Sequence, residues 1–280
     1  MSAQELGDAS LLFDSNEVAR LSDADRLPVS AFIPTTRPDP SELAAISKEL
    51  QQWELQGIKL QTVLCSSYPA NLKSVFDCPP LIFTKGSLAV IDAYGVAVVG
   101  TRKASREGLA RATKLARELA ESKITVYSGL AAGIDAAAHT SALRAGGRTI
   151  VVIGTGLLKV YPKENAALQD EIASRFAVVS QFWPDEKTER WHFPTRNKVM
   201  SGLARATVVV EAGDTSGAKL QAEAAIKHGK PVFLMASLVE TFEWAKKFSQ
   251  NSGVYTFSRT EELIERLDQI FEEPLVACGF

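Results

Sequence analysis

The stretch VAVVGTRKAS (96–105) decides the fold class. Its first four residues are all apolar, which is typical of a parallel strand covered on both faces. Gly100 ends this strand at the point where an open α/β sheet usually binds its ligand. A dinucleotide-binding loop would continue with further glycines in the pattern G-x-G-x-x-G, whereas this chain offers Arg102, Lys103 and Ser105. The stretch therefore predicts a parallel α/β sheet with cationic and hydroxyl side chains at its ligand-binding edge.

Composition limits the classes of protein that the chain could be. Of its 280 residues, 46% are apolar, which is enough for a substantial core, and the formal net charge is only −2. A polyanionic partner would therefore have to be met by a local basic patch. No apolar run approaches the ~20 residues that cross a bilayer, and the first residues lack a signal sequence. The three scattered cysteines form neither a metal knuckle nor a disulfide framework, which indicates reduced thiols in the cytoplasm.

Apolar strands alternate with amphipathic helices, which predicts a doubly wound, mostly parallel sheet. We expect strands at 62–65, 81–84, 96–99, 125–127, 149–153, 178–180, 207–210, 232–235 and 255–257. We expect helices at 41–55, 108–122, 135–143, 165–176, 194–204, 216–228 and 260–271. The proline-rich leader favours a division into an N-terminal extension, 1–60, and an α/β domain, 61–280. The one helix of the extension should pack through its apolar side: Leu43, Ile46, Leu50 and Trp53.

Four strand tips carry glycine beside hydroxyl groups, after Val99, Tyr127, Ile153 and Val210. Glycine lets a ligand approach the backbone closely, and the helix that follows offers free amides to an anion. Short connections between strands and helices also need glycine for geometry alone, so no single loop is decisive. The four together, with two cations in the first, indicate a phosphate-binding edge.

A second basic element is KTERWHFPTRNK (187–198), which holds four Lys or Arg residues against Glu189 alone, so 4 − 1 gives +3. Trp191, His192 and Phe193 are interleaved with these charges. Single-stranded nucleic acid is bound in this way, with phosphates on cations and bases stacked on rings at ~1–3 kcal/mol per base. The alternative is that Trp191 and Phe193 fill the core while the charges are solvated.

Signals for catalysis are weak. The three histidines show no metal-ligand spacing, and no nucleophile signature occurs. Asp135 and His139 lie four residues apart on one helix face, where a local hydrogen bond is a commoner role than acid–base catalysis. Glu211 is the best lone carboxylate for acid–base work, but neither nucleophile nor metal ligand stands beside it. We therefore expect no enzyme activity, no cofactor and no metal.

Six blocks of sequence, in this order, resemble the DNA-processing protein A (DprA/Smf) family. They are YPANLKSVFDCPPLIFTKG (68–86), VAVVGTRKAS (96–105), SGLAAGIDAAAHTSAL (128–143), GGRTIVVIGTGLLKVYPKEN (146–165), FPTRNKVMSGLA (193–204) and VVVEAGDTSGAKLQAEAA (208–225). The resemblance implies an extended Rossmann-like fold of the Smf/DprA–LOG superfamily. It also implies binding of single-stranded DNA, interaction with a RecA recombinase during DNA uptake or recombination, and a homodimer.

The resemblance assigns Arg102 to a phosphate contact and Phe193 and Arg196, of the F-P-x-R-N block, to a DNA pocket. The full set of expected DNA- or phosphate-binding residues is Arg102, Lys103, Ser105, Ser128, Gly129, Gly154, Lys163, Arg190, Phe193, Arg196, Asn197, Lys198, Ser216, Gly217 and Lys219.

The chain departs from the family pattern at three motifs. It has Gln181 where the family has glutamate, Lys198 where it has arginine, and Ala236-Ser237 where it has Pro-Gly. We also expect no winged-helix domain in the tail after Phe257. Two other functions stay open: a small-nucleotide sensor, for example in phage defence, and a nucleotide phosphoribohydrolase, whose P-G-G-x-G-T-x-x-E block is absent here.

Overall fold

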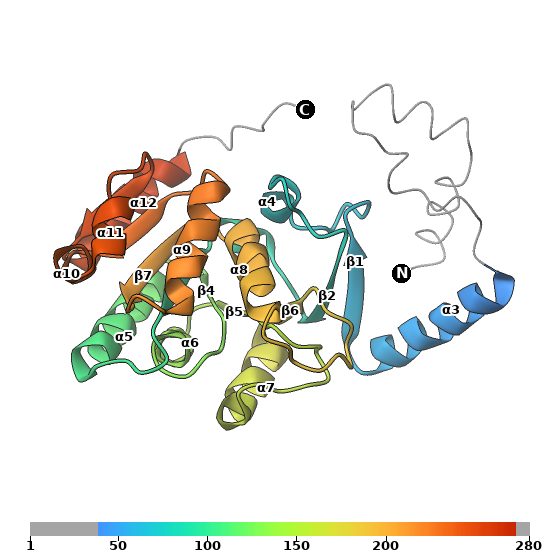
Figure 1. Ribbon diagram of the computed structural model, residues 1–280. Helices are drawn as coiled ribbons and strands as arrows, with labels where there is room; N and C mark the ends of the chain where they lie inside the picture. The colour runs from blue at the N-terminus through green and yellow to red at the C-terminus, as the bar shows by residue number, and fades with distance from the viewer. Residues whose placement is uncertain (1–38, 273–280) are drawn as a thin grey trace, which may run out of the picture.

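The computed structural model describes residues 39–272. Their strands form one nine-stranded mixed sheet, and helices cover it (Figure 1). The strand order is β1-β2-β6-β5-β4-β3-β7-β8-β9. All neighbours from β6 to β9 pair in parallel, whereas β1 and β2 add an antiparallel edge. The prediction of a doubly wound, mostly parallel sheet is confirmed. The strands are β1 (Ile58–Thr62), β2 (Leu81–Gly86), β3 (Val96–Gly100), β4 (Val126–Ser128), β5 (Thr149–Val152), β6 (Ala177–Ser180), β7 (Ala206–Glu211), β8 (Val232–Met235) and β9 (Val254–Phe257).

The seven expected helices are present within a few residues of their predicted ends, and shorter ones are added. The helices are α3 (Pro40–Leu55), α4 (Ala70–Lys73), α5 (Arg106–Glu121), α6 (Ile134–Arg144), α7 (Ala166–Arg175), α8 (His192–Leu203), α9 (Gly217–Lys227), α10 (Ala236–Thr241), α11 (Glu243–Phe248) and α12 (Thr260–Glu272), with 3-10 turns η2 (Val90–Tyr94) and η3 (Lys163–Asn165). The sequence missed α4, α10 and α11 because four to six residues are too few for a helical period to show. None of the helices within residues 39–272 has both the length and the apolarity that crossing a membrane requires.

The strand order changes direction between β3 and β7. From β3 the chain proceeds outward through β4, β5 and β6, and it then returns to place β7 on the other side of β3. Right-handed crossovers therefore put α5, α6 and α7 on one face and α8 and α9 on the other. Because the chain leaves β3 and β7 toward opposite faces, their carboxyl ends diverge and leave a crevice, the usual ligand site of an open α/β sheet.

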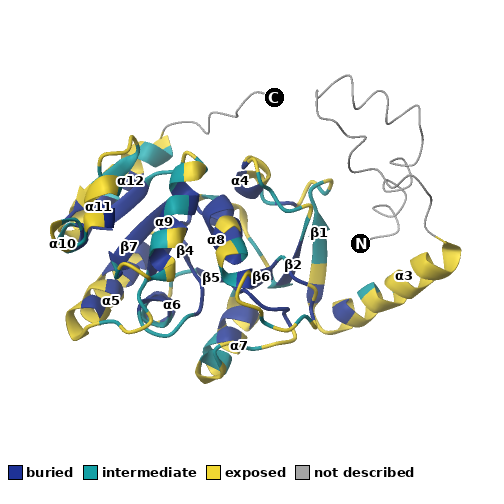
Figure 2. Ribbon diagram, viewed as in Figure 1, coloured by how far each residue is buried: buried dark blue, intermediate teal, exposed yellow. Residues whose placement is uncertain are grey.

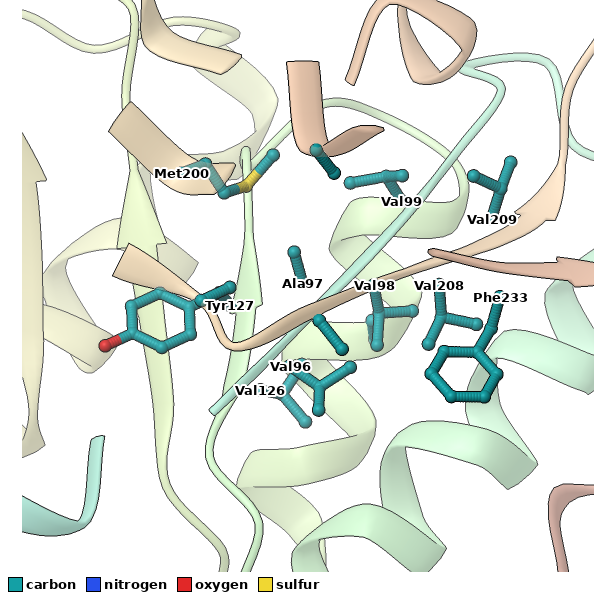
Figure 3. Close-up of a cluster of buried hydrophobic side chains, with 14 of the residues drawn as sticks. Val96, Ala97, Val98, Val99, Val126, Tyr127, Met200, Val208, Val209 and Phe233 are labelled. Carbon is teal, nitrogen blue, oxygen red and sulfur yellow. The ribbon is translucent and has the colours of Figure 1, made fainter. Parts of the chain in front are cut away.

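The core is built on β3 and its neighbours. Val96, Ala97 and Val98 are fully buried, and Figure 3 shows them packed among side chains of β4, β7 and β8. Burial on both faces explains why β3 is apolar at every position. Burial of the Val96 and Val98 side chains contributes ~1.5–3 kcal/mol each to the stability of the fold. The strand therefore holds the loop after Gly100 on a rigid base.

Two expectations near the N-terminus are wrong. The first strand is Ile58–Thr62 rather than 62–65, because this segment pairs with β2, whereas residues 63–65 turn back. The apolar side of α3 is also largely uncovered: Leu43 and Ile46 are each 47% exposed, and only Trp53 is buried, against Phe83 at 5.5 Å between ring centres (Figure 2). The division of the chain at residue 60 stays a prediction, and residues 1–38 lie outside the described part.

Candidate nucleic-acid interface

The carboxyl ends of β3 and β7 open into a pocket of about 400 Å³, here called the crest pocket. The loops after both strands, the first turns of α8 and the start of α9 form its walls. This is the place that the change of direction in the sheet predicts. Seven of the expected site residues line it: Arg102, Lys103, Phe193, Arg196, Asn197, Ser216 and Gly217.

Arg102 lies against Phe193, with its guanidinium carbon 5.3 Å from the ring centre. The Phe193 ring also contacts Tyr161, with 5.5 Å between ring centres. These three side chains also line a smaller pocket of about 100 Å³, together with Gly129 and Gly154. Arg102 and Phe193 therefore belong to both pockets, so a cation and an aromatic face meet where the two adjoin.

Arg196 is buried beneath the loop after β4. Its Nη1 donates to the carbonyl oxygens of Gly129 and Val152, both at 2.7 Å, and its Nε donates to Asn197 Oδ1 at 3.1 Å. A Cβ at Gly129 would overlap this guanidinium, so any side chain there would displace Arg196. Burial lowers the pKa of Arg196, although the nearby Asp135 carboxylate opposes that shift. Arg196 thus joins three elements of the fold, in addition to lining the pocket as the sequence predicted.

Ser105 and Glu211 have structural roles at the start of α5. The Ser105 hydroxyl accepts from Gly108 N at 2.9 Å, which is an N-cap. Glu211 in turn accepts from Ser105 N at 2.9 Å and from Ser105 Oγ at 2.7 Å. A side chain at position 108 would overlap the Glu211 carboxylate. Both of these polar groups are therefore committed to holding β7 and α5 together.

The start of α9 forms one wall of the crest pocket. Ser216 caps it by accepting from Ala218 N at 3.3 Å, and Asn197 Nδ2 donates to Gly217 O at 3.2 Å. The positive end of the helix dipole therefore faces the pocket, where it favours an anion. Gln221, one turn further along α9, lines the same pocket although it is only 1% exposed, and its Oε1 has no hydrogen-bond partner among the described residues.

The structure does not bring every expected residue to the pockets. Ser128 is fully buried and donates to Val98 O at 2.6 Å, so its hydroxyl is closed to a ligand. Lys198 pairs instead with Asp77, at 3.1 Å, because it faces the side of α8 toward α4. Three further expected residues line neither pocket, namely Lys163, Arg190 and Lys219.

The aromatic residues at the start of α8 divide between the core and the surface. His192 is fully buried and stacks on Phe182 with 4.0 Å between ring centres, whereas Trp191 is 54% exposed. Phe193 is partly exposed in the pocket wall. The residue that fills the core is thus His192, and the alternative of a core role for Trp191 and Phe193 is wrong.

Asp135 makes the expected local hydrogen bond within the loop after β4, but it does not pair with His139. Asp135 is buried and accepts from Gly129 N at 3.1 Å, and burial raises its pKa. His139 Nδ1 is instead 2.6 Å from Thr149 Oγ1 on β5, and burial lowers its pKa to about 3. A neutral, buried imidazole and a buried carboxyl with separate partners are not an acid–base couple.

Sequence reasoning missed three of the residues that line the pockets: Tyr161, Met200 and Gln221. Gln221 lies four residues after Gly217, so the helical period could have placed it on the same side of α9. Tyr161 lies in the loop after β5, whose strand tip was already part of the predicted edge. Met200 carried no polar signal and could be found only from the packing of α8.

Sequence comparison relates the chain to DNA-processing proteins. Residues 59–268 match the family model of DNA recombination-mediator protein A. DNA processing protein DprA of Streptococcus pneumoniae is 42% identical over 190 residues, which are 68% of this chain and 65% of that protein. DNA processing protein DprA of Bacillus subtilis is 30% identical over 253 residues, 86% of this chain and 85% of that protein.

Solved structures of DNA processing protein A have the same fold as this chain. DNA processing protein A from S. pneumoniae superposes with a TM-score of 0.71 at 37% identity, covering 79% of this chain and 77% of that one. DNA processing protein A from Helicobacter pylori, whose structure concerns its single-stranded DNA binding mode, gives a TM-score of 0.67 at 24% identity, covering 75% of this chain and 96% of that one. At that identity the Helicobacter protein supports the fold alone. Because the family match runs from β1 into α12 and includes every loop around the crest pocket, the chain belongs to the DNA recombination-mediator protein A family, which contains the DprA and Smf proteins.

Proposed function

We propose that the protein binds single-stranded DNA at the crest pocket. The observation that carries this proposal is the contact of Arg102 with Phe193, at 5.3 Å, in the wall that two pockets share. A phosphate can take the guanidinium as a charge-assisted partner while an unstacked base lies against the rings of Phe193 and Tyr161. A rigid duplex keeps its bases stacked inside, so this combination suits a single strand.

The charge around the crest pocket supports an anionic ligand. Arg102 and Lys103 are exposed and have no carboxylate partner among the described residues. The carboxyl group that does line the pocket belongs to Asp135, whose pKa is raised by burial and whose oxygen accepts from Gly129 N. Because the α9 N-terminus also lines the pocket, a phosphate there meets positive potential from the helix as well as from the two cations.

The name of the family supports a role in recombination, whereas the homodimer and the RecA-like partner are our own proposals. The Helicobacter pylori relative was studied for its single-stranded DNA binding mode, and the matching family is named for recombination mediation. We also propose that this protein mediates recombination as a homodimer by loading a RecA-like recombinase on single strands, without itself catalysing a covalent step. Co-sedimentation with a RecA protein, and the mass of the free protein in solution, test these two points separately.

The binding proposal is tested by filter binding of single-stranded against double-stranded DNA of one sequence across a salt series. We expect tighter binding of the single strand and an affinity that falls linearly with salt on logarithmic axes. Equal binding of both forms, or binding indifferent to salt, would contradict the proposal.

A second candidate ligand is a free mononucleotide. The observation in its favour is Gln221, whose buried Oε1 lacks a partner within residues 39–272. It lines a pocket of about 400 Å³, a volume within the usual range for small-ligand sites. Calorimetry with nucleoside monophosphates and oligo-dT distinguishes the two. Saturable binding of a monophosphate with no binding of oligo-dT would favour this second candidate.

A further inference from the structure

A second cavity, of about 600 Å³, lies between α5 and α6 on the surface of the protein. We call it the α5–α6 groove. The two helices run side by side on one face of the sheet (Figure 1). Arg102 and Lys103 line both this groove and the crest pocket, so the two cavities meet at these cations. Thr113, Thr140 and Arg144 line the groove further along the helices.

The charge of the groove is wholly positive. Arg102, Lys103 and Arg144 line it, and no carboxylate does among the described residues. Arg144 is exposed in the last turn of α6 and makes no hydrogen bond or ion pair within residues 39–272. On α5, by contrast, Lys114 lies 3.7 Å from Glu118 and Arg117 lies 3.7 Å from Glu121, so these two cations have carboxylate partners. Uncompensated cations around one concave surface attract a polyanion.

The shape of the groove is fixed before any ligand arrives. Ser141 Oγ on α6 donates to Thr113 O on α5 at 2.6 Å, which ties the two helices together. Between the cations the wall is made of small residues and of Leu109, which is 38% exposed. Because a helix rises 1.5 Å per residue, the groove extends along α6 for roughly 15 Å away from the crest pocket. This length offers room for further phosphates and for an apolar contact with a base or sugar.

We propose that the α5–α6 groove holds the phosphodiester chain of the same DNA strand as it leaves the crest pocket, with Arg144 contacting a phosphate at the far end. This inference rests on the proposed function, because it extends the path of the ligand assigned there. Arg102 and Lys103 stand where the two cavities meet and bind the phosphates that pass from one to the other. The bound strand would thereby follow a path from the crest pocket along the groove between α5 and α6.

The test compares a short and a long oligo-dT, of about 4 and about 16 nucleotides, the range of site sizes known for single-strand binding folds. The variants are Arg144→Gln and, as a matched control, Arg175→Gln. Arg175 ends α7 as Arg144 ends α6, and it is exposed but lies outside the groove. Binding is measured by fluorescence anisotropy at several salt concentrations. Thermal melting checks that both variants remain folded, which is expected because both side chains are exposed.

For Arg144→Gln we expect severalfold weaker binding of the long strand and unchanged binding of the short strand. The salt slope for the long strand should be smaller by about 0.7, which is the value for one lost phosphate contact on a single strand. Arg175→Gln should bind both lengths as the wild type does. Unchanged binding of the long strand by Arg144→Gln would overturn the inference, and so would an equal loss at both lengths. Absence of any binding by the wild type would instead overturn the proposed function itself.

Discussion

The guanidinium carbon of Arg102 lies 5.3 Å from the ring centre of Phe193, which brings the loop after β3 onto the first turn of α8. These segments are far apart in the sequence, and only the return of the chain to β7 makes them neighbours. A cation over an aromatic face is stabilised by ~0.5–1 kcal/mol at an exposed site, so the contact orients Arg102 without burying it. The guanidinium remains open to a phosphate.

Replacing Arg102 with alanine is therefore expected to weaken binding of oligo-dT. The loss of one phosphate contact should lower the salt slope by about 0.7, and the effect should be the same for strands of different sequence. Filter binding over a salt series measures both quantities. Lys198→Ala is the matched control, because Lys198 was also an expected site residue but pairs with Asp77 at 3.1 Å. A weaker effect for Arg102→Ala than for Lys198→Ala would remove Arg102 from the interface.

Phe193→Ala tests the stacking surface. If a base lies on this ring, its removal should cost about 1–3 kcal/mol of binding free energy with little change in the salt slope, because no charge is lost. Phe193→Tyr should bind nearly as the wild type does. The control is Phe76→Ala, since Phe76 is an exposed ring at 73% that lines neither pocket. Equal affinities for Phe193→Ala and the wild type would show that no base stacks there.

Arg196→Ala is expected to lower the free energy of unfolding. Its removal would leave the carbonyls of Gly129 and Val152 without their donor and Asp135 without its nearby positive charge. Breaking a buried charge arrangement by removing one partner costs about 3–5 kcal/mol in the free energy of unfolding. Urea denaturation measures this loss, with Arg190→Ala as an exposed control expected near zero. A fully stable Arg196→Ala that binds DNA weakly would show that Arg196 acts as a ligand of the DNA pocket rather than as a support of the fold.

Much of the fold was predictable because its signals are local. The uniformly apolar β3 and the regular period of α5 each reveal their burial within a single segment. The position of the ligand site was predictable for a related reason, since loops after parallel strands always emerge at one edge. The uncovered side of α3 was not predictable, because an apolar stripe shows only that a partner could be used.

The roles of individual polar residues could not be predicted, because each depends on contacts distant in sequence. Arg196 and Lys198 lie two residues apart in one basic block, yet one is buried beneath Gly129 and the other pairs with Asp77 on a different side of α8. Ser105 was likewise expected to bind the ligand and Glu211 was the candidate for acid–base work, whereas the two bond to each other at 2.7 Å. A sequence block gives the charges of a surface, and only the packing decides which of them a ligand can reach.

His139 should make the fold sensitive to acid. Burial lowers its pKa in the folded protein to about 3, whereas an unfolded histidine titrates near 6.5. Between these two values the unfolded chain binds a proton that the native protein does not, so stability is lost as the pH falls through this window. It is fully retained above about 6.5. The slope contributed by this one group is at most about 1.4 kcal/mol per pH unit.

Urea denaturation at a series of pH values measures this slope in the wild type and in His139→Gln. Burial also lowers the pKa of His228, although Asp77 opposes that shift, so part of the acid sensitivity should survive in the variant. The difference between the two slopes isolates His139. An NMR titration of the folded wild type provides a second measurement that does not depend on the variant. A His139 imidazole that protonates near pH 6.5 in the native protein, together with equal slopes, would show that water reaches this side chain between β5 and α6.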